Sequence, residues 1–443
     1  MFSKLSQSMI NKKPIFISLS PNVEKDDISL SFKLLFNPFQ WKKGKAIQLL
    51  EEKFKSFGYT FSFNSGRTAL LAILKSLGLE KNDEILIQAF TCNAAVNPIF
   101  WAGLKPVFVD IEKETLNINP SDLEKKISPK SKAIMVQHTF GKPAELDRIL
   151  EICEKHNLIL IEDCAHALGA EYNDKNWHPA PSEEEAGSSI SQPRFARGRI
   201  GTFGKAAFFS LGRDKIISSV YGGMAVTQDK VLAEKIREFQ KHLKFPNLFW
   251  IKKQLLHPIL TKKLIMPLYG FFGLGKYKLV ALQRLGILSK AVHKMEKQGK
   301  MPKYLFKKMP NALALLGLHQ FEKLEKFNKH RYEIAKIYKQ FERVAPVQEY
   351  IEKRVFMRYS VFVENSDEIL EKFKKKGIYL DDGWRKSVVV PIGTNLEKMG
   401  YIKGSCPVAE EVADKILNLP THINISKEQA EKIKNLLKRF QEQ

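Results

Sequence analysis

The sequence predicts an α/β fold with a mostly parallel sheet, and three observations support this prediction. From about residue 46, short apolar runs typical of strands alternate with segments whose apolar residues recur at helical spacing. Helix start and stop signals separate these segments. Strands that alternate with helices indicate a mostly parallel sheet covered on both faces. Because ligands of such sheets bind beyond the carboxyl ends of the strands, residues that directly follow a strand are candidates for a site.

The predicted elements follow one another in regular order. The predicted helices cover residues 46–58, 68–79, 94–103, 121–127, 145–157 and a segment from about 229. The predicted strands cover 60–66, 83–90, 105–111, 132–141, 158–165, 206–211 and 222–228. A glycine ends the second helix, and Ser121 is predicted to cap the fourth.

The length of 443 residues exceeds what one simple core accommodates. We expect a large domain over 1–235, a helical insert over 236–308 and a small C-terminal domain over 309–443. The last is predicted to begin with one long helix from Asn311, followed by strands near 359–365 and 387–392 and helices near 366–377 and 427–440. A hydrophobic fraction of 44% and a charged fraction of 27% are ordinary for a soluble globular protein.

Four scattered cysteines, without a CxxC pair, argue against a disulfide framework or a zinc site, so no metal is expected. The N-terminus lacks the apolar core of a signal peptide, and no apolar stretch is long enough to span a bilayer. These features predict a cytoplasmic protein that does not cross a membrane.

The net charge of +24 is concentrated in one part of the chain. Residues 241–308 hold 16 Lys or Arg against a single acid, Glu296, and so contribute +15, which leaves +9 for the rest. Residues 173–200, rich in Pro, Ser, Gly and charge, predict a long mobile loop.

The first chemical motif is NSGRTALLAIL at 64–74, where a strand ends, a Ser-Gly turn follows and a helix starts. Amide groups at a helix N-terminus bind phosphate, and glycine permits close approach of the backbone. The alternative is a helix that is simply capped.

The second motif is LILIEDCAHALGA at 158–170, in which Asp163 ends a buried strand. A buried carboxylate needs a partner, and a protonated pyridine nitrogen is a suitable one. The alternatives are an N-cap role for Asp163 and, for His166 beyond it, a histidine satisfied by local hydrogen bonds.

The third motif is AAFFSLGRDKIISSVYGGM at 206–224, where a strand ends at Ser210 and Lys215 follows five residues later. A lysine becomes a nucleophile when burial or nearby positive charge lowers its pKa, and otherwise it is a solvated surface group. Arg213 is placed to lower this pKa or to bind an anion, or else is a solvated surface charge.

In order and spacing these motifs resemble the DegT/StrS group of fold-type-I PLP enzymes, the nucleotide-sugar aminotransferases. The resemblance covers about 45–235 and 309 to the end. It rests on SGRTAL, KPVFVDIEKETLNI, HTFGKPAELDRI, IEDCAHALGAEY, GTFGKAAFFS, the Ser210–Lys215 spacing and AEEVADKILNLPTHINIS. It implies a seven-stranded, mostly parallel sheet between helices, with a smaller C-terminal α+β domain.

The resemblance also implies a cofactor, pyridoxal 5′-phosphate (PLP), and roles for individual residues. Lys215 matches the Schiff-base lysine, Asp163 the partner of the pyridine nitrogen and Ser210 the phosphate-binding serine. His166 takes the place of a usual glutamine near the cofactor ring. The cradle for the cofactor phosphate corresponds to Gly66 and to the backbone of Arg67 and Thr68.

Three positions depart from the pattern of the group. Cys92 occupies the place of an aromatic residue over the cofactor, and Arg213 and Asp214 replace a proline-threonine pair. Phe306, Lys307 and Lys308 replace the Asn-Tyr-Arg segment that serves the partner subunit's site.

The implied function is ping-pong transamination from glutamate to a keto sugar linked to a nucleotide, in polysaccharide biosynthesis, by a homodimer. The alternatives are a PLP-dependent sugar dehydratase and a catalytically idle, membrane-associated scaffold of the same fold. The dehydratases of the group lack the lysine, so Lys215 favours transamination.

The segment 241–308 mixes large apolar residues with paired lysines and contains Pro246, Pro258 and Pro267, so it predicts several short helices. One reading is an amphipathic surface on anionic lipid at the inner face of the membrane. The others are a packed helical subdomain with a solvated basic face and an oligomer contact. Nucleic acid is not an expected partner, because no recognition fold accompanies the charge.

Overall fold

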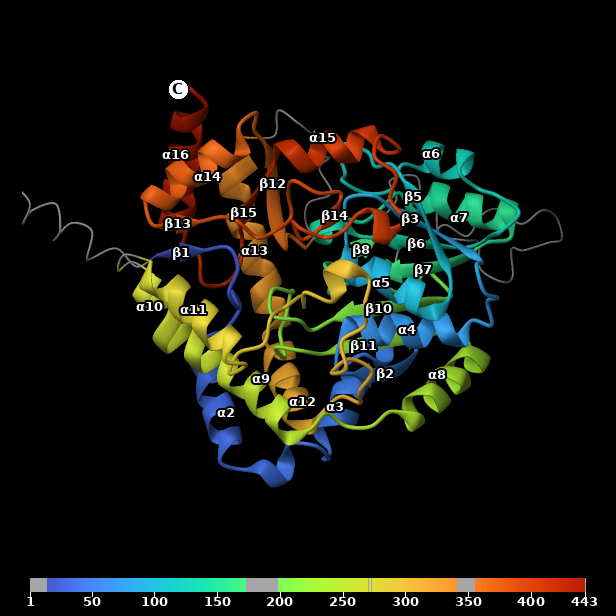
Figure 1. Cartoon of the computed structure of the whole chain (residues 1–443), viewed down its shortest axis with the longest axis horizontal. Coiled ribbons are helices and arrows are strands. Elements are labelled where there is room, and N and C mark those ends of the chain that lie inside the picture. The colour runs from blue at the N-terminus through green and yellow to red at the C-terminus, as the bar shows by residue number, and fades with distance from the viewer. Residues whose placement is uncertain are drawn as a thin grey trace, which may run out of the picture.

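The computed structural model describes residues 14–172, 198–269, 271, 273–339, 341 and 355–442. Most of the predicted 173–200 loop therefore lies outside the described residues. Within the described part, the chain forms a large α/β unit, a smaller C-terminal unit and a helical insert (Figure 1).

A seven-stranded sheet forms the centre of the large unit, as expected. Its order is β2-β11-β10-β7-β6-β3-β5. The five strands from β10 to β5 are parallel to one another, whereas β11 is antiparallel to both of its neighbours, β2 and β10. The strands are β2 (Tyr59–Phe63), β3 (Glu84–Gln88), β5 (Lys105–Val109), β6 (Ser131–Gln137), β7 (Ile159–Asp163), β10 (Ala206–Ser210) and β11 (Gly223–Thr227). Every residue of β3 and β11 is buried, which is typical of sheets covered on both faces.

The helices of the large unit lie near the predicted positions, apart from the first, which was not predicted. They are α2 (Lys25–Leu35), α3 (Ala46–Lys53), α4 (Gly66–Ser76), α5 (Asn93–Ala102), α6 (Pro120–Lys125), α7 (Leu146–His156) and α8 (Lys230–His242). The predicted cap of α6 is wrong: Asn119, not Ser121, accepts the amide hydrogens of the first turn. Asn119 is the residue before Pro120, and proline is favoured at the first helical position.

The C-terminal unit has its own apolar core. It contains α13 (Leu324–Tyr338), β12 (Arg358–Phe362), α14 (Ser366–Lys375), β13 (Ile378–Tyr379), α15 (Pro407–Lys415), β15 (Ile416–Pro420) and α16 (Lys427–Gln441). The single long helix predicted from Asn311 is wrong: α12 (Asn311–Phe321) ends before α13 begins, so the chain turns between the two cores.

The packing crosses the predicted domain limits at several places. Helix α8 spans residue 235 and packs on α4, while α12 packs on α3 within the main core. Near the N-terminus, β1 (Ile15–Phe16) pairs with β13 of the C-terminal unit. The predicted domain limits at residues 235 and 308 therefore stay a prediction from the sequence.

The insert folds into short helices, as its prolines predicted. These are α9 (Leu248–Leu260), the π-helical turn η4 (Thr261–Ile265), α10 (Met266–Tyr269) and α11 (Leu274–Arg284), followed by η5 (Glu296–Gln298). Figure 1 shows α9, α10 and α11 in yellow tones at the lower left, beside the blue α2. Among the described residues, no helix is both long enough and apolar enough to cross a bilayer.

Candidate functional site

A cavity of about 390 Å³ lies where β7 and β10 end, and it receives residues from the large unit, the C-terminal unit and the insert. This volume is within the range of about 300–1,000 Å³ typical of small-molecule sites. Seven of the eight residues predicted from the sequence line it: Gly66, Arg67, Cys92, Asp163, His166, Ser210 and Lys215. Motifs spread over 150 positions of the chain thus meet in one place.

Lys215 lies in the loop after β10, and its backbone is held firmly. Asn22 donates to the carbonyl oxygens of Lys215 and Ile216, and the buried Arg331 donates to the Ile216 oxygen at 2.9 Å. Burial lowers the pKa of Lys215, although the charges of Cys92, Asp163 and Asp214 partly offset this shift. A lowered pKa increases the fraction of neutral, nucleophilic amine.

Asp163 is the last residue of β7, lines the same cavity as Lys215 and is only 6% exposed. Its Oδ1 accepts the amide hydrogen of Ala165 at 2.9 Å. Burial raises the pKa of Asp163, while this hydrogen bond and the charges of Lys215 and His138 act in the opposite direction. The carboxylate is thus costly to ionise unless a cation joins it in the cavity.

His166 is buried in an aromatic wall of the cavity. Its ring stacks on Phe140 at a centroid distance of 5.5 Å and meets the edge of Trp384 at 4.9 Å. Its Nδ1 accepts the amide hydrogen of Phe140 at 3.4 Å, which leaves the ring proton on Nε2. Burial lowers the pKa of His166 well below 6.5, and the charges of Lys215 and Arg358 add to this shift, so the ring is neutral near pH 7.

The N-terminus of α4 opens into the cavity beside Ser210. A side chain at Gly66 would bring its Cβ within 3.1 Å of Ser210 Cβ, and one at Gly223 would lie 2.4 Å from the Gly66 nitrogen. Gly223 therefore requires glycine, and Gly66 leaves only a tight space for a side chain. Ser65 caps the helix by accepting the Thr68 amide hydrogen at 3.2 Å, which places Thr68 behind the cavity wall, where its side chain is fully buried.

Cys92 ends the two-residue strand β4 (Thr91–Cys92) and caps α5, because its Sγ accepts the Ala94 amide hydrogen at 3.4 Å. Burial raises the pKa of this thiol, so it is neutral near pH 7. Trp384 of the C-terminal unit brings an aromatic side chain to the same cavity.

We call residues 286–299 the strap. This segment passes over the cavity and binds the side chains of two arginines. Arg67 forms an ion pair with Glu296 and donates to the Ala291 oxygen at 3.2 Å. Arg213 donates to the oxygen of Ser289 at 2.6 Å, and its Nε has no hydrogen-bond partner although it is buried. The single acid of the basic segment is thus a buried partner of the motif that begins α4.

The same-chain segment 304–308 completes the surroundings of α4. The amide of Phe306 donates to Thr68 Oγ1 at 3.2 Å, and the Asn64 amide donates to the Lys307 oxygen at 3.1 Å. The residues that replace the Asn-Tyr-Arg motif therefore support the helix start of their own chain.

Sequence reasoning missed the residues by which the C-terminal unit closes the cavity. Arg358 at the start of β12 and Asp382 lie against each other, with Arg358 Nε 3.3 Å from Asp382 Oδ2, and both line the cavity with Trp384. The available signal was the run Asp381-Asp382-Gly383-Trp384, a polar turn with a large aromatic residue directly after a strand.

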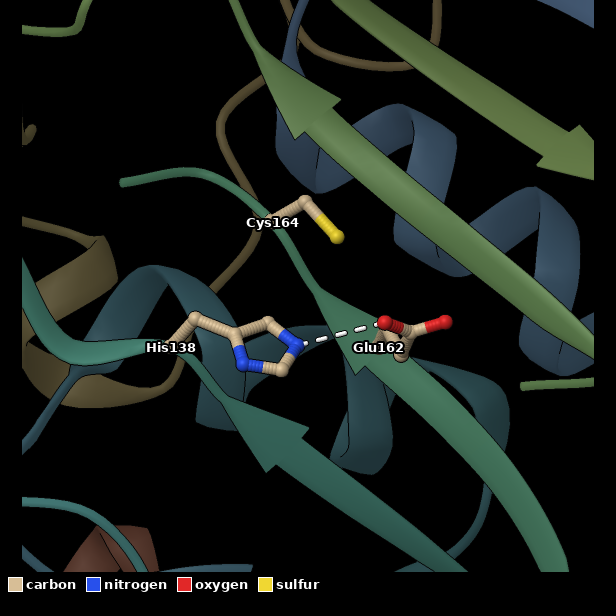
Figure 2. Close-up of side chains that lie close together, drawn as sticks. All are labelled: His138, Glu162 and Cys164. Atoms are coloured by element: carbon tan, nitrogen blue, oxygen red, sulfur yellow. Dashed lines mark hydrogen bonds and ion pairs between the residues drawn. The ribbon is translucent and has the colours of Figure 1, made fainter. Parts of the chain in front are cut away.

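A second polar cluster, on the other side of β7, is accounted for by hydrogen bonds. His138, Glu162 and Cys164 lie close together and are buried (Figure 2). The Glu162 carboxylate accepts the amides of Gly201, Phe203 and Gly204 at 2.7–2.8 Å and faces His138 Nε2 at 3.3 Å. His138 Nδ1 accepts from the Ala144 amide, so the neutral ring carries its proton on Nε2, which faces the Glu162 carboxylate.

The family model for the DegT/DnrJ/EryC1/StrS aminotransferases matches residues 24–249 and 276–438. The chain belongs to this family. The unmatched residues between the two segments hold most of α9 together with η4 and α10, so the core of the insert is foreign to the family pattern.

Two characterised relatives support the same class of activity. GDP-perosamine synthase of Escherichia coli O157:H7 is 28% identical over 394 residues, covering 87% of this chain and 88% of that protein. Spore coat polysaccharide biosynthesis protein SpsC of Bacillus subtilis is 28% identical over 332 residues, covering 74% and 69%. The chain is an aminotransferase of a sugar aminotransferase family.

Solved structures share the fold. Helicobacter pylori PseC, an aminotransferase involved in pseudaminic acid biosynthesis, aligns with a TM-score of 0.69 at 23% identity, over 97% of this chain and 100% of that one. The PLP form of the putative sugar aminotransferase Spr1654 from Streptococcus pneumoniae aligns with a TM-score of 0.69 at 19% identity, over 96% and 99%. Enzymes of this family depend on PLP, which is the cofactor of this chain.

Proposed function

We propose that this aminotransferase moves an amino group from glutamate to a keto sugar carried on a nucleotide. The observation that carries the proposal is the single cavity in which a buried carboxylate and an amine of lowered pKa, Asp163 and Lys215, interact beside the start of α4. The relatives named for perosamine synthesis and for spore coat polysaccharide support a sugar as the acceptor.

The residues of the cavity fit PLP. The amides at the start of α4, near Gly66 and Arg67, and the hydroxyl of Ser210 suit a phosphate. The Ser210 hydroxyl accepts from the Gly212 amide, which leaves its hydrogen free to donate. Asp163 suits a protonated ring nitrogen, which would remove the cost of its buried charge. Cys92 and His166 are assigned to the flanks of the ring, and Thr68 to the backbone behind the phosphate.

When bound, PLP supplies an aldehyde that condenses with amines and a ring that withdraws electrons from the neighbouring carbon. We assign proton transfer to Lys215. Its Nζ takes the proton from the α-carbon of glutamate and, in the second half of the reaction, delivers a proton to the former keto carbon of the sugar. The neutral His166 and the edge of Trp384 form a wall that excludes water from these steps.

No feature of the described residues favours a dehydratase or an idle scaffold. The dehydratases of the group lack the lysine, whereas Lys215 lines the cavity with its neighbours in place. We further propose that the enzyme works in the cytoplasm as a homodimer, since the resembling enzymes build their sites at a subunit interface.

The test is a screen of keto-sugar nucleotides with glutamate, read as formation of 2-oxoglutarate. The wild-type enzyme is expected to convert at least one nucleotide-linked keto sugar. Lys215→Ala should lose activity by about 10²–10⁴-fold or more, because it removes both the general base and the nucleophile. The matched control is Lys230→Ala, a change at the first residue of α8, away from the cavity.

Asp163→Asn gives a second readout. It is expected to weaken PLP binding and to lower activity, since an amide does not balance the charge of a ring cation. Turnover of free keto sugars, with no turnover of nucleotide-linked ones, would contradict the proposed acceptor. Full activity of Lys215→Ala would contradict the proposed site.

A further inference from the structure

Two aromatic and basic segments, distant in sequence, lie together on one side of the molecule. One is the insert, for which a lipid contact was one of three readings of the sequence. The other is residues 32–45, which no motif singled out and which run from the end of α2 through the turn η1 (Pro38–Gln40). Helices α2 and α9 pack side by side and join the two segments (Figure 1). We call the combined surface the aromatic-basic face.

Large apolar side chains point into solvent throughout this face. In the N-terminal segment, Phe36 is 75% and Phe39 is 95% exposed. In the insert, Phe249 at the start of α9 is 63% exposed, and Tyr277 on α11 is 71% exposed. Single exposed apolar residues are ordinary, but a patch of this size on neighbouring elements marks an interaction surface.

The exposed charges of the face are basic. Lys33, Lys42, Lys43 and Lys45 flank the exposed phenylalanines, and the insert adds a second set at Lys252, Lys263, Lys276, Lys278 and Arg284. The acids of these elements are engaged elsewhere. Glu296 is buried against Arg67, and Asp26 and Asp27 of α2 form ion pairs with Lys323, although Asp26 itself is half-exposed.

Aromatic side chains surrounded by exposed lysines match the chemistry of a bilayer surface with anionic headgroups. A second copy of the chain fits less well, because a two-fold symmetric contact through this face sets lysines against lysines. We propose that the aromatic-basic face, including residues 32–45, binds the surface of an anionic membrane. The strap, which follows α11, then holds the cavity close to the bilayer.

The experiment measures co-sedimentation of the PLP-loaded enzyme with vesicles, without substrates. Binding is expected to vesicles of phosphatidylcholine and phosphatidylglycerol in equal parts, and to weaken at high salt. Vesicles of phosphatidylcholine alone should bind far less. Because no turnover is measured, the result is independent of the proposed sugar substrate.

Variants locate the contact. Phe36→Ala with Phe39→Ala should lower the partition coefficient by about tenfold, as partial burial of two rings is lost. Lys42→Glu with Lys43→Glu should lower it by at least about fivefold for each charge removed. The matched control is Ile402→Ala with Lys403→Glu, an exposed apolar-basic pair outside the face.

Thermal unfolding and the visible absorbance of bound PLP confirm that each variant is folded. The proposal is overturned if the enzyme does not bind anionic vesicles at low salt, or if the variants at 36, 39, 42 and 43 bind like the control. It is also overturned if these variants change the dimer fraction in mass photometry, since the face would then be a contact between copies.

Discussion

Arg67, in the first turn of α4, forms an ion pair with Glu296 of the strap, and both side chains are almost completely buried. The pair connects the helix start assigned to the cofactor phosphate with the strap, which follows the unmatched residues of the insert. Glu296 also accepts the amide hydrogen of His293 at 2.8 Å and the hydroxyl of Tyr304 at 3.2 Å. One carboxylate thus fixes the strap to the cavity.

Glu296→Gln is expected to lower the free energy of unfolding by about 3–5 kcal/mol, because it leaves the charge of Arg67 buried without its partner. Denaturant unfolding followed by fluorescence measures the change. Glu397→Gln, which alters an exposed acid in the C-terminal unit, should have no comparable effect. Equal stability of the wild type and Glu296→Gln would show that the pair adds nothing to the fold.

Arg213→Lys tests the second contact of the strap, between Arg213 and Ser289. The guanidinium donates to both the oxygen and the hydroxyl of Ser289, and lysine keeps the charge but loses this forked geometry. We expect the dissociation constant of PLP to rise by about tenfold, since hydrogen bonds of charged groups contribute about 1.5–3 kcal/mol. PLP titration followed by absorbance measures it. Arg284→Lys, an exposed change at the end of α11, is the control and should leave the constant unchanged.

Much of the cavity could be predicted because its residues directly follow strands. Asp163 and Ser210 are the last residues of β7 and β10, and parallel strands bring their carboxyl ends to one edge of the sheet. Arg358 and Trp384 could not be predicted, because both lie far along the chain and only the packing of the C-terminal unit against the large unit brings them to the edge of the sheet. The role of Glu296 was hidden for the same reason. In the sequence, a single acid in a basic segment is typical of a surface charge. Only the fold of the insert places Glu296 next to α4.

Glu162→Gln tests the other side of β7. Adjacent strand residues point to opposite faces, so Glu162 lies behind the sheet edge while its neighbour Asp163 lines the cavity. Its carboxylate accepts hydrogen bonds from three backbone amides of the turn at 201–204. Loss of its charge should lower the free energy of unfolding by about 1.5–3 kcal/mol.

PLP should still bind to the Glu162→Gln variant, because the change lies outside the cavity. Glu154→Gln, an exposed change on α7, is the control for unfolding. A variant of normal stability that fails to retain PLP would contradict the separation of the two faces.

His166→Gln is expected to keep most of the activity and to alter the pH dependence of stability. Burial holds the pKa of His166 well below its unfolded value of about 6.5, so the folded protein binds fewer protons than the unfolded chain in this range. The wild type therefore loses stability as the pH falls below about 6.5, by at most about 1.4 kcal/mol per pH unit from this residue. Glutamine does not titrate, so the variant should lose less, and its amide oxygen can still accept from the Phe140 amide.

The measurement is denaturant unfolding at pH 7.5, 6.5 and 5.5, values that span about one unit on either side of the unfolded pKa. Parallel curves for the two proteins would show that the pKa of His166 is the same in the folded and unfolded states, which would contradict its burial in the wall of the cavity.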